Sequence, residues 1–173
     1  NQGVFHETLN LAALWKLPVV FICENKRFGM GTAVERSTAV WDIYHKASAY
    51  DITRQWIDGM DVLEMYRVVK QAVDRARKSN EPTMLEARTY RFRGHSMSDP
   101  IHGHYRTKKE VEEQKKSDPI LAFGHELMEA GILAQKTIDE MELEIKKIVD
   151  ESVEFAEHSP EPPADFLYEN VYV

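Results

Sequence analysis

Hydrophobic residues in the first half of the chain follow two alternating patterns. Over residues 4–15 they recur at helical spacing, whereas residues 17–23 form one continuous apolar run. Such a run is typical of a parallel strand buried on both faces. The spacing of apolar residues also predicts a short helix at residues 41–50 and a second strand at residues 52–57.

A longer amphipathic helix is expected after the second strand. Asp61 and Glu64 have the spacing of an N-terminal capping pair, and the apolar residues that follow share one helical face up to about Arg77. Pro82 then opens a third predicted strand, residues 83–92. Helices and strands therefore alternate, which predicts an α/β fold with a doubly wound, mostly parallel sheet.

The second half of the chain changes character. Residues 93–107 contain two glycines, one proline and three histidines without apolar periodicity, which is typical of a functional loop. Beyond it the pattern is helical: Asp118 and Pro119 suit a helix start, and Thr137 with Glu140 predicts a capping box. C-terminal helices should therefore follow the sheet.

These patterns predict three regions. They are an α/β domain at 1–107 that includes the loop 93–107, a helical extension at 108–158, and a proline-rich aromatic tail at 159–173 expected to pack on a neighbour. The chain starts at once with a helical pattern and no initiator Met, so we expect a fragment without its N-terminal part.

Composition and charge exclude several classes of protein. A net charge of −7 with no basic block argues against binding to nucleic acid or to an anionic membrane surface. The longest apolar stretch is far too short to cross a bilayer. Cys23 is the only cysteine, which excludes a disulfide framework and favours a reducing compartment.

The loop after the first predicted strand is a candidate ligand site. Ligands of open parallel sheets bind at the carboxyl ends of strands, and residues 24–31 occupy that position. Asn25 is a good oxygen donor to magnesium, while Lys26 and Arg27 can balance phosphate charge. The alternative is an ordinary turn with solvated cations, and residue types alone favour that alternative.

A second candidate loop, residues 90–100, follows the third predicted strand. His95 in this loop could donate a hydrogen bond to a phosphate or transfer a proton. A lone loop histidine is more often merely solvated, and that reading holds more strongly for His102 and His104. No metal-ligand spacing accompanies them, so a zinc hydrolase is not expected.

Short motifs in both loops and along nearly the whole chain resemble those of one protein family. They include Phe21-Ile-Cys-Glu-Asn25, Arg27-Phe-Gly-Met-Gly31, Asp58-Gly-Met-Asp61, Gly94-His-Ser-Met-Ser-Asp-Pro100, Tyr105-Arg-Thr107 and Ser117-Asp-Pro119. In this order they resemble the alpha subunit of the pyruvate dehydrogenase component, a thiamine diphosphate-dependent 2-oxo acid dehydrogenase. So many matches in the same order make it improbable that the two loops are ordinary solvated turns.

The resemblance implies a thiamine diphosphate-binding fold, incomplete at its N-terminus, and a chain that is a C-terminal fragment. The family's cofactor motif begins with Gly-Asp-Gly upstream of Asn1 and ends in two asparagines, which here read Asn25-Lys26. Lys26 stands where the family has a magnesium ligand, and a protonated lysine has no lone pair. The backbone carbonyl of Phe28 matches the other remaining ligand.

Three hypotheses follow from the substitution at residue 26. Asn25 takes over coordination of Mg²⁺, Lys26 contacts the diphosphate and replaces part of the metal's charge, or the site is crippled. All three stay open at this point.

The resemblance also assigns roles in the second loop. His95 matches a catalytic-site histidine that contacts the diphosphate, within a loop, residues 93–107, that orders when the cofactor binds. Ser96 matches a serine that is phosphorylated in the animal enzymes, whereas the second such serine is His104 here. A cytoplasmic bacterial protein is therefore expected, with the mitochondrial matrix as the location if the source is eukaryotic.

The implied activity is decarboxylation of pyruvate and transfer of the acetyl group to a lipoyl group. The implied partners are a beta subunit, within a heterotetramer, and a lipoyl-bearing dihydrolipoamide acetyltransferase. The rivals are an acetoin dehydrogenase alpha subunit and an assembly module without cofactor affinity. A nicotinamide-binding fold is disfavoured, because no Gly-x-Gly-x-x-Gly follows a strand.

Overall fold

The chain forms two compact units. A computed structural model describes residues 2–99 and 105–171. The first unit spans Asn1–Phe123 and the second spans Gly124–Val173. The three predicted regions do not coincide with these units, and the boundaries at 107 and 158 stay predictions.

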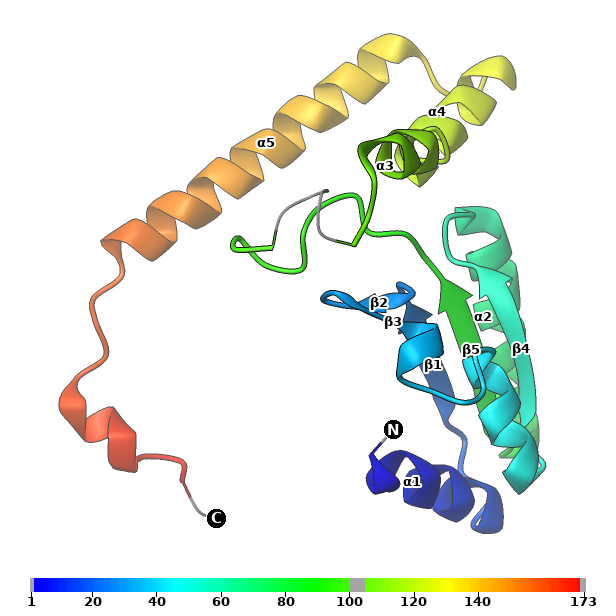
Figure 1. Ribbon diagram of the computed structural model, residues 1–173. Coiled ribbons are helices and arrows are strands. Elements are labelled where there is room, and N and C mark those ends of the chain that lie inside the picture. Colours follow the sequence, from blue (N-terminus) through cyan, green and yellow to red (C-terminus); the bar gives the residue numbers. More distant parts are fainter. Residues whose placement is uncertain (1, 100–104, 172–173) are drawn as a thin grey trace. The chain divides into compact units, whose positions relative to one another are not determined.

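A three-stranded parallel sheet forms the centre of the first unit (Figure 1). Strands β1 (Val20–Asn25), β5 (Thr83–Arg88) and β4 (Thr53–Asp58) lie in the order β1-β5-β4. Thr83 of the central strand is level with Val20 on one side and Thr53 on the other. All three carboxyl ends therefore meet at one edge, as the sequence pattern predicts.

Helices cover both faces of this sheet, which confirms the predicted α/β class. The 18-residue helix α2 (Val62–Ser79) packs on one face, and helix α1 (Gly3–Leu14) with the 3₁₀ helix η2 (Ile43–Tyr50) packs on the other. The α2 face buries Ile57, Val68, Ala72, Leu85 and Ala87. The opposite face buries Leu9, Ala47, Ile52 and Met84.

The capping prediction for α2 is confirmed at Asp61. One carboxylate oxygen of Asp61 accepts hydrogen bonds from the backbone N–H groups of Leu63 and Glu64, both at 2.9 Å. The Glu64 carboxylate accepts instead from the N–H of Asp58 at 3.3 Å, so the box is not reciprocal. Asn80 ends the helix in a left-handed conformation.

Two details of the first predicted strand are wrong. Strand β1 begins at Val20 rather than residue 17, because Lys16 adopts a left-handed φ of 50° and turns the chain. It is also not buried on both faces: it lies at the sheet edge, and Ile22 is 49% exposed. The short helix predicted at residues 41–50 is confirmed, and it is a 3₁₀ helix that begins at Ile43.

Short elements follow the strands at the carboxyl edge of the sheet. A hairpin of two short strands, β2 (Phe28–Gly29) and β3 (Thr32–Ala33), follows β1 and leads into the 3₁₀ helix η1 (Val34–Arg36). Strand β5 ends at Arg88, earlier than predicted, and the following loop leads to helix α3 (Lys108–Lys115). Thr107 caps α3 by accepting from the N–H of Glu110.

The remaining chain is helical, as predicted. Helix α4 (Pro119–Glu129) starts with Asp118 accepting from the N–H of Ile120, which confirms the predicted start. Helix α5 (Gln135–His158) begins two residues before Thr137, so the predicted capping box is wrong. The 3₁₀ helix η3 (Ala164–Tyr168) follows. None of the helices within the described ranges is long and apolar enough to cross a membrane.

Candidate active site

The Asn25 side chain is built into the end of strand β1. It is 8% exposed, and its amide nitrogen donates to the Glu86 carboxylate at 2.8 Å. Its amide oxygen accepts from the backbone N–H of Arg27 at 2.9 Å. Each end of the amide therefore makes one hydrogen bond within the protein, which fixes its orientation and leaves the oxygen one further lone pair.

Lys26 and Phe28, in the same loop, make an ion pair and an aromatic contact, respectively. The Lys26 ammonium lies 2.8 Å from the Glu24 carboxylate, and both side chains are exposed. The hydrogen bond from Lys26, followed by its charge, lowers the pKa of Glu24. The Phe28 ring lies 5.2 Å from that of Tyr105, which ties the β2–β3 hairpin to the segment before α3.

His95 is held by an arginine within the second loop. Its Nδ1 lies 3.0 Å from an Arg91 guanidinium nitrogen. Because a guanidinium can only donate, Nδ1 must accept, and the ring proton then resides on Nε2. In this tautomer the Nε2–H of His95 is left as a donor.

Asp99 and Tyr105 close the turn that carries His95. The Asp99 carboxylate accepts from the backbone N–H of His95 at 2.7 Å and from the Tyr105 hydroxyl at 2.6 Å. These two bonds, in that order, lower the pKa of Asp99. Ser96 is exposed on the same turn, with its hydroxyl 3.0 Å from that of Ser98.

A buried arginine anchors the start of this loop. The Arg106 guanidinium donates to the backbone carbonyls of Arg91 and Arg93, the latter at 3.1 Å. It also lies 4.9 Å from the Tyr105 ring centre, in a cation–π arrangement. The sequence reasoning did not assign roles to Arg91, Asp99 or Arg106, although the Tyr105-Arg-Thr107 motif pointed to this segment.

The two candidate loops meet in one cavity of about 500 Å³. All four predicted cofactor or metal positions line it, namely Asn25, Lys26, Phe28 and His95. Among the described residues that line it are three permanent cations, Lys26, Arg27 and Arg91, and one carboxylate, that of Glu24. His102 and His104 lie outside the described residues, so nothing is added to their prediction.

The donor set of this cavity fits an anion better than a metal. Ammonium, guanidinium and imidazole N–H groups match the acceptor oxygens of a diphosphate. Among the side chains of the described residues, no three of His, Cys, Asp or Glu gather where they could hold a metal ion. A diphosphate therefore fits these residues, whereas the described side chains offer Mg²⁺ no carboxylate cluster.

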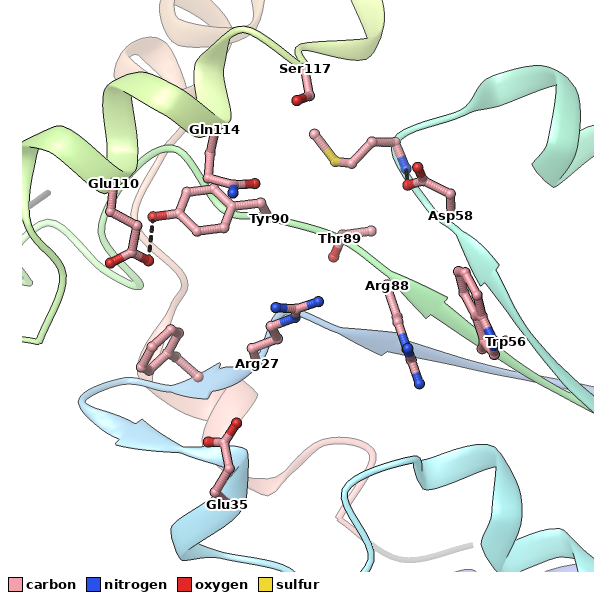
Figure 2. Close-up of a pocket in the computed structure, with 12 residues that line it drawn as sticks. Arg27, Glu35, Trp56, Asp58, Arg88, Thr89, Tyr90, Glu110, Gln114 and Ser117 are labelled. Carbon is pink, nitrogen blue, oxygen red and sulfur yellow. Dashed lines mark hydrogen bonds between the residues drawn. The ribbon is translucent and has the colours of Figure 1, made fainter.

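A second cavity, of about 470 Å³, shares Arg27 and Phe28 with the first (Figure 2). Figure 2 shows Arg27 pointing into it and a hydrogen bond between Tyr90 and Glu110 of α3. In this bond the Tyr90 hydroxyl donates to the Glu110 carboxylate, and the two oxygens are 3.2 Å apart. The Arg88 guanidinium lies 4.7 Å from the Trp56 ring centre at its other end. Charges of both signs line this cavity, so it is less selective for an anion than the first.

Comparison with known proteins assigns the chain to a family. The sequence profile of the family described as "Dehydrogenase E1 component" matches residues 1–165. The chain belongs to the dehydrogenase E1 component family. The resemblance inferred from the motifs is thereby confirmed, and the two loops that form the cavity lie inside the matched range.

Relatives of this E1 component chain come from bacteria and mammals. It is 46% identical to the pyruvate dehydrogenase E1 component subunit alpha of Rickettsia bellii over all 173 residues, which are 52% of that protein. It is 43% identical to the testis-specific mitochondrial form from Rattus norvegicus, covering 99% of this chain and 44% of that protein. The chain thus spans about half the length of the curated relatives it matches.

Proposed function

We propose that this chain supplies the diphosphate-binding part of a thiamine diphosphate site in a pyruvate dehydrogenase, as part of its alpha subunit. Family membership and the names of the relatives support the reaction class. The observation that carries the proposal is the convergence of Lys26 and His95, 69 positions apart in the sequence, on one cavity. A second cation, Arg91, holds the histidine there.

The proposed roles follow from the hydrogen-bonding capacity of each group. Lys26 leaves Glu24 and binds a diphosphate oxygen, and the Nε2–H of His95 donates to another. Arg91 keeps His95 in the tautomer that can donate. Asn25 holds the loop through both ends of its amide. When bound, thiamine diphosphate supplies the electron sink for loss of carbon dioxide from a 2-oxo acid.

Of the three hypotheses for residue 26, we favour charge compensation by Lys26. The Lys26 ammonium is exposed and lines the cavity, where it can reach an anion, whereas Asn25 is 8% exposed and its amide oxygen already accepts one hydrogen bond from Arg27. The described residues do not fit Mg²⁺ by themselves, and we assign no step to the ion. Magnesium ligation by the Phe28 carbonyl stays a prediction.

The remaining assignments belong to the whole protein. We propose pyruvate as the substrate, with a beta subunit and a lipoyl-bearing dihydrolipoamide acetyltransferase as partners, in the bacterial cytoplasm. The bacterial relatives, which are named pyruvate dehydrogenase E1 component subunit alpha, support this choice. Phosphorylation of Ser96 would add roughly two negative charges beside the proposed diphosphate and oppose binding.

Calorimetric titration of thiamine diphosphate into the full-length chain, assembled with its beta subunit, tests the proposal. We expect binding with and without magnesium, and weaker binding in Lys26→Met. Lys70→Met is the matched control, because it also removes an exposed lysine paired with a carboxylate, away from the cavity. Absence of binding in the unmodified protein would refute the proposal and favour an assembly module.

A further inference from the structure

A buried carboxylate lies directly behind the candidate site. Glu86, on the central strand β5, is 0% exposed. It faces the side of the sheet covered by α1 and η2, between Met84 of the core and Arg88 at the strand end. A buried carboxylate is costly unless it is fully hydrogen-bonded, so its retention in a sheet centre requires compensating partners.

Three donors satisfy the Glu86 carboxylate. One oxygen accepts from the Asn25 amide nitrogen at 2.8 Å and from the Arg88 guanidinium at 3.3 Å. The other oxygen accepts from the backbone N–H of Tyr44, in η2, at 2.9 Å. The carboxylate thus links β1, β5 and η2 immediately before the carboxyl edge of the sheet.

The contact with Glu86 determines which way the Asn25 amide faces. A carboxylate only accepts, so the NH₂ end of Asn25 must point toward Glu86 and the oxygen must point away. That oxygen receives the N–H of Arg27 at 2.9 Å. Arg27 has a left-handed φ of 61°, a conformation that costs free energy for a non-glycine residue and needs such a support.

The turn supported in this way carries the groups that we assign to the cofactor. Lys26 lies inside it, between the two residues joined by the hydrogen bond, and Phe28 follows it. The carbonyl of Arg27 also accepts from the N–H of Val34 at 2.9 Å, so the turn positions the β2–β3 hairpin as well. A change at Glu86 is therefore transmitted to the cavity without Glu86 lining it.

We propose that Glu86 is a positioning residue for the cofactor site: it orients the Asn25 amide, which holds the turn that presents Lys26 to the diphosphate. This inference rests on the proposed function. Glu86 itself touches neither substrate nor cofactor in this account.

Glu86→Gln tests the inference with almost no change of shape. The new NH₂ group must face either the Tyr44 N–H or the Asn25 amide nitrogen, so one donor meets another. If Asn25 turns over in response, its NH₂ faces the N–H of Arg27 and the turn loses its support. Loss of one hydrogen bond to a charged acceptor predicts a dissociation constant for thiamine diphosphate that rises roughly tenfold or more.

Two comparison variants separate positioning from general destabilisation. Leu85→Ala removes a fully buried neighbour on the opposite face of β5, so it should lower the melting temperature and leave cofactor affinity unchanged. Asn25→Asp combined with Glu86→Gln restores an acceptor toward Arg27 and a donor–acceptor pair between residues 25 and 86. The double variant should bind more tightly than Asn25→Asp alone, which places the same carboxylate beside the cavity.

The measurement is calorimetric titration of thiamine diphosphate into the assembled full-length protein, with melting temperatures recorded for each variant. If the unmodified protein and Glu86→Gln bind thiamine diphosphate equally well, the role of Glu86 is overturned and the proposed function still stands. Affinity losses that follow the melting temperature equally in Glu86→Gln and Leu85→Ala also overturn it. If Glu86→Gln fails to assemble, a double variant that binds more tightly than Asn25→Asp supports the proposal, and a double variant that binds no more tightly overturns it.

Discussion

Gly94, one residue before His95, leaves no room for a side chain. A Cβ atom added there would lie 1.9 Å from the carbonyl oxygen of Asp99 and 3.1 Å from that of Ser96. Ordinary contact begins near 3.4 Å, so the Asp99 carbonyl in Gly94→Ala must retreat by about 1.5 Å. The obstacle is backbone rather than a flexible side chain, so the loop itself must change shape.

The displacement should reach His95, because the Asp99 carboxylate accepts from its backbone N–H. Misplacement of a binding group by about 1 Å can cost a factor on the order of 100. We therefore predict that Gly94→Ala weakens thiamine diphosphate binding roughly 10- to 100-fold. The melting temperature should change little, because neither hydrophobic cluster of the sheet includes this loop.

Calorimetric titration of the assembled full-length protein measures this effect. Gly3→Ala is the control: it has no atom within 4 Å of the added Cβ, does not have a positive φ and does not line the cavity. It should bind the cofactor as the unmodified protein does. Equal affinities for Gly94→Ala and Gly3→Ala would refute the reasoning.

Three further predictions concern charges and caps. Glu24→Gln removes the partner of Lys26 and should tighten diphosphate binding a few-fold in calorimetry; weaker binding would contradict the role of Lys26. Asp61→Ala removes the cap of α2 and should lower the free energy of unfolding by about 1 kcal/mol in urea titrations, whereas Asp74→Ala, which loses only an exposed pair with Lys70, should cost less than about 0.5 kcal/mol. The pKa of Asp99 is lowered, first by the His95 N–H and then by the Tyr105 hydroxyl, so its stabilisation of the loop is present above the ordinary pKa of 3.8 and is lost as the pH falls through the lower folded pKa. Amide exchange of residues 95–99 should accelerate there in the unmodified protein, and Asp99→Asn should remove this acid dependence.

Much of the first unit could be predicted from periodicity. The alternation of helices with apolar strands correctly predicted a parallel sheet covered on both faces. Ligands of parallel sheets bind at strand carboxyl ends, and this rule alone predicts both loops of the cavity as candidate sites. The cap at Asp61 could be predicted from local sequence, because the N–H groups that donate to it belong to Leu63 and Glu64, only two and three residues later.

Other features depend on contacts that no local pattern reveals. Nothing in the sequence around Glu86 distinguishes it from an exposed glutamate of a strand. Its hydrogen-bond partner Asn25 is 61 residues away in the sequence. Thr137 and Glu140 have the spacing of a capping box, yet α5 already begins at Gln135. The edge position of β1, which leaves Ile22 half-exposed, depends on strand order and not on the apolar run itself.

The central claim is that the two loops bind one cofactor together, and hydrogen exchange tests it most directly. The measurement compares amide exchange in the assembled full-length protein with and without thiamine diphosphate. Our account predicts joint protection of residues 25–29 and 91–99 when the cofactor is added. Saturating cofactor that protects neither segment, or only one of them, would contradict it.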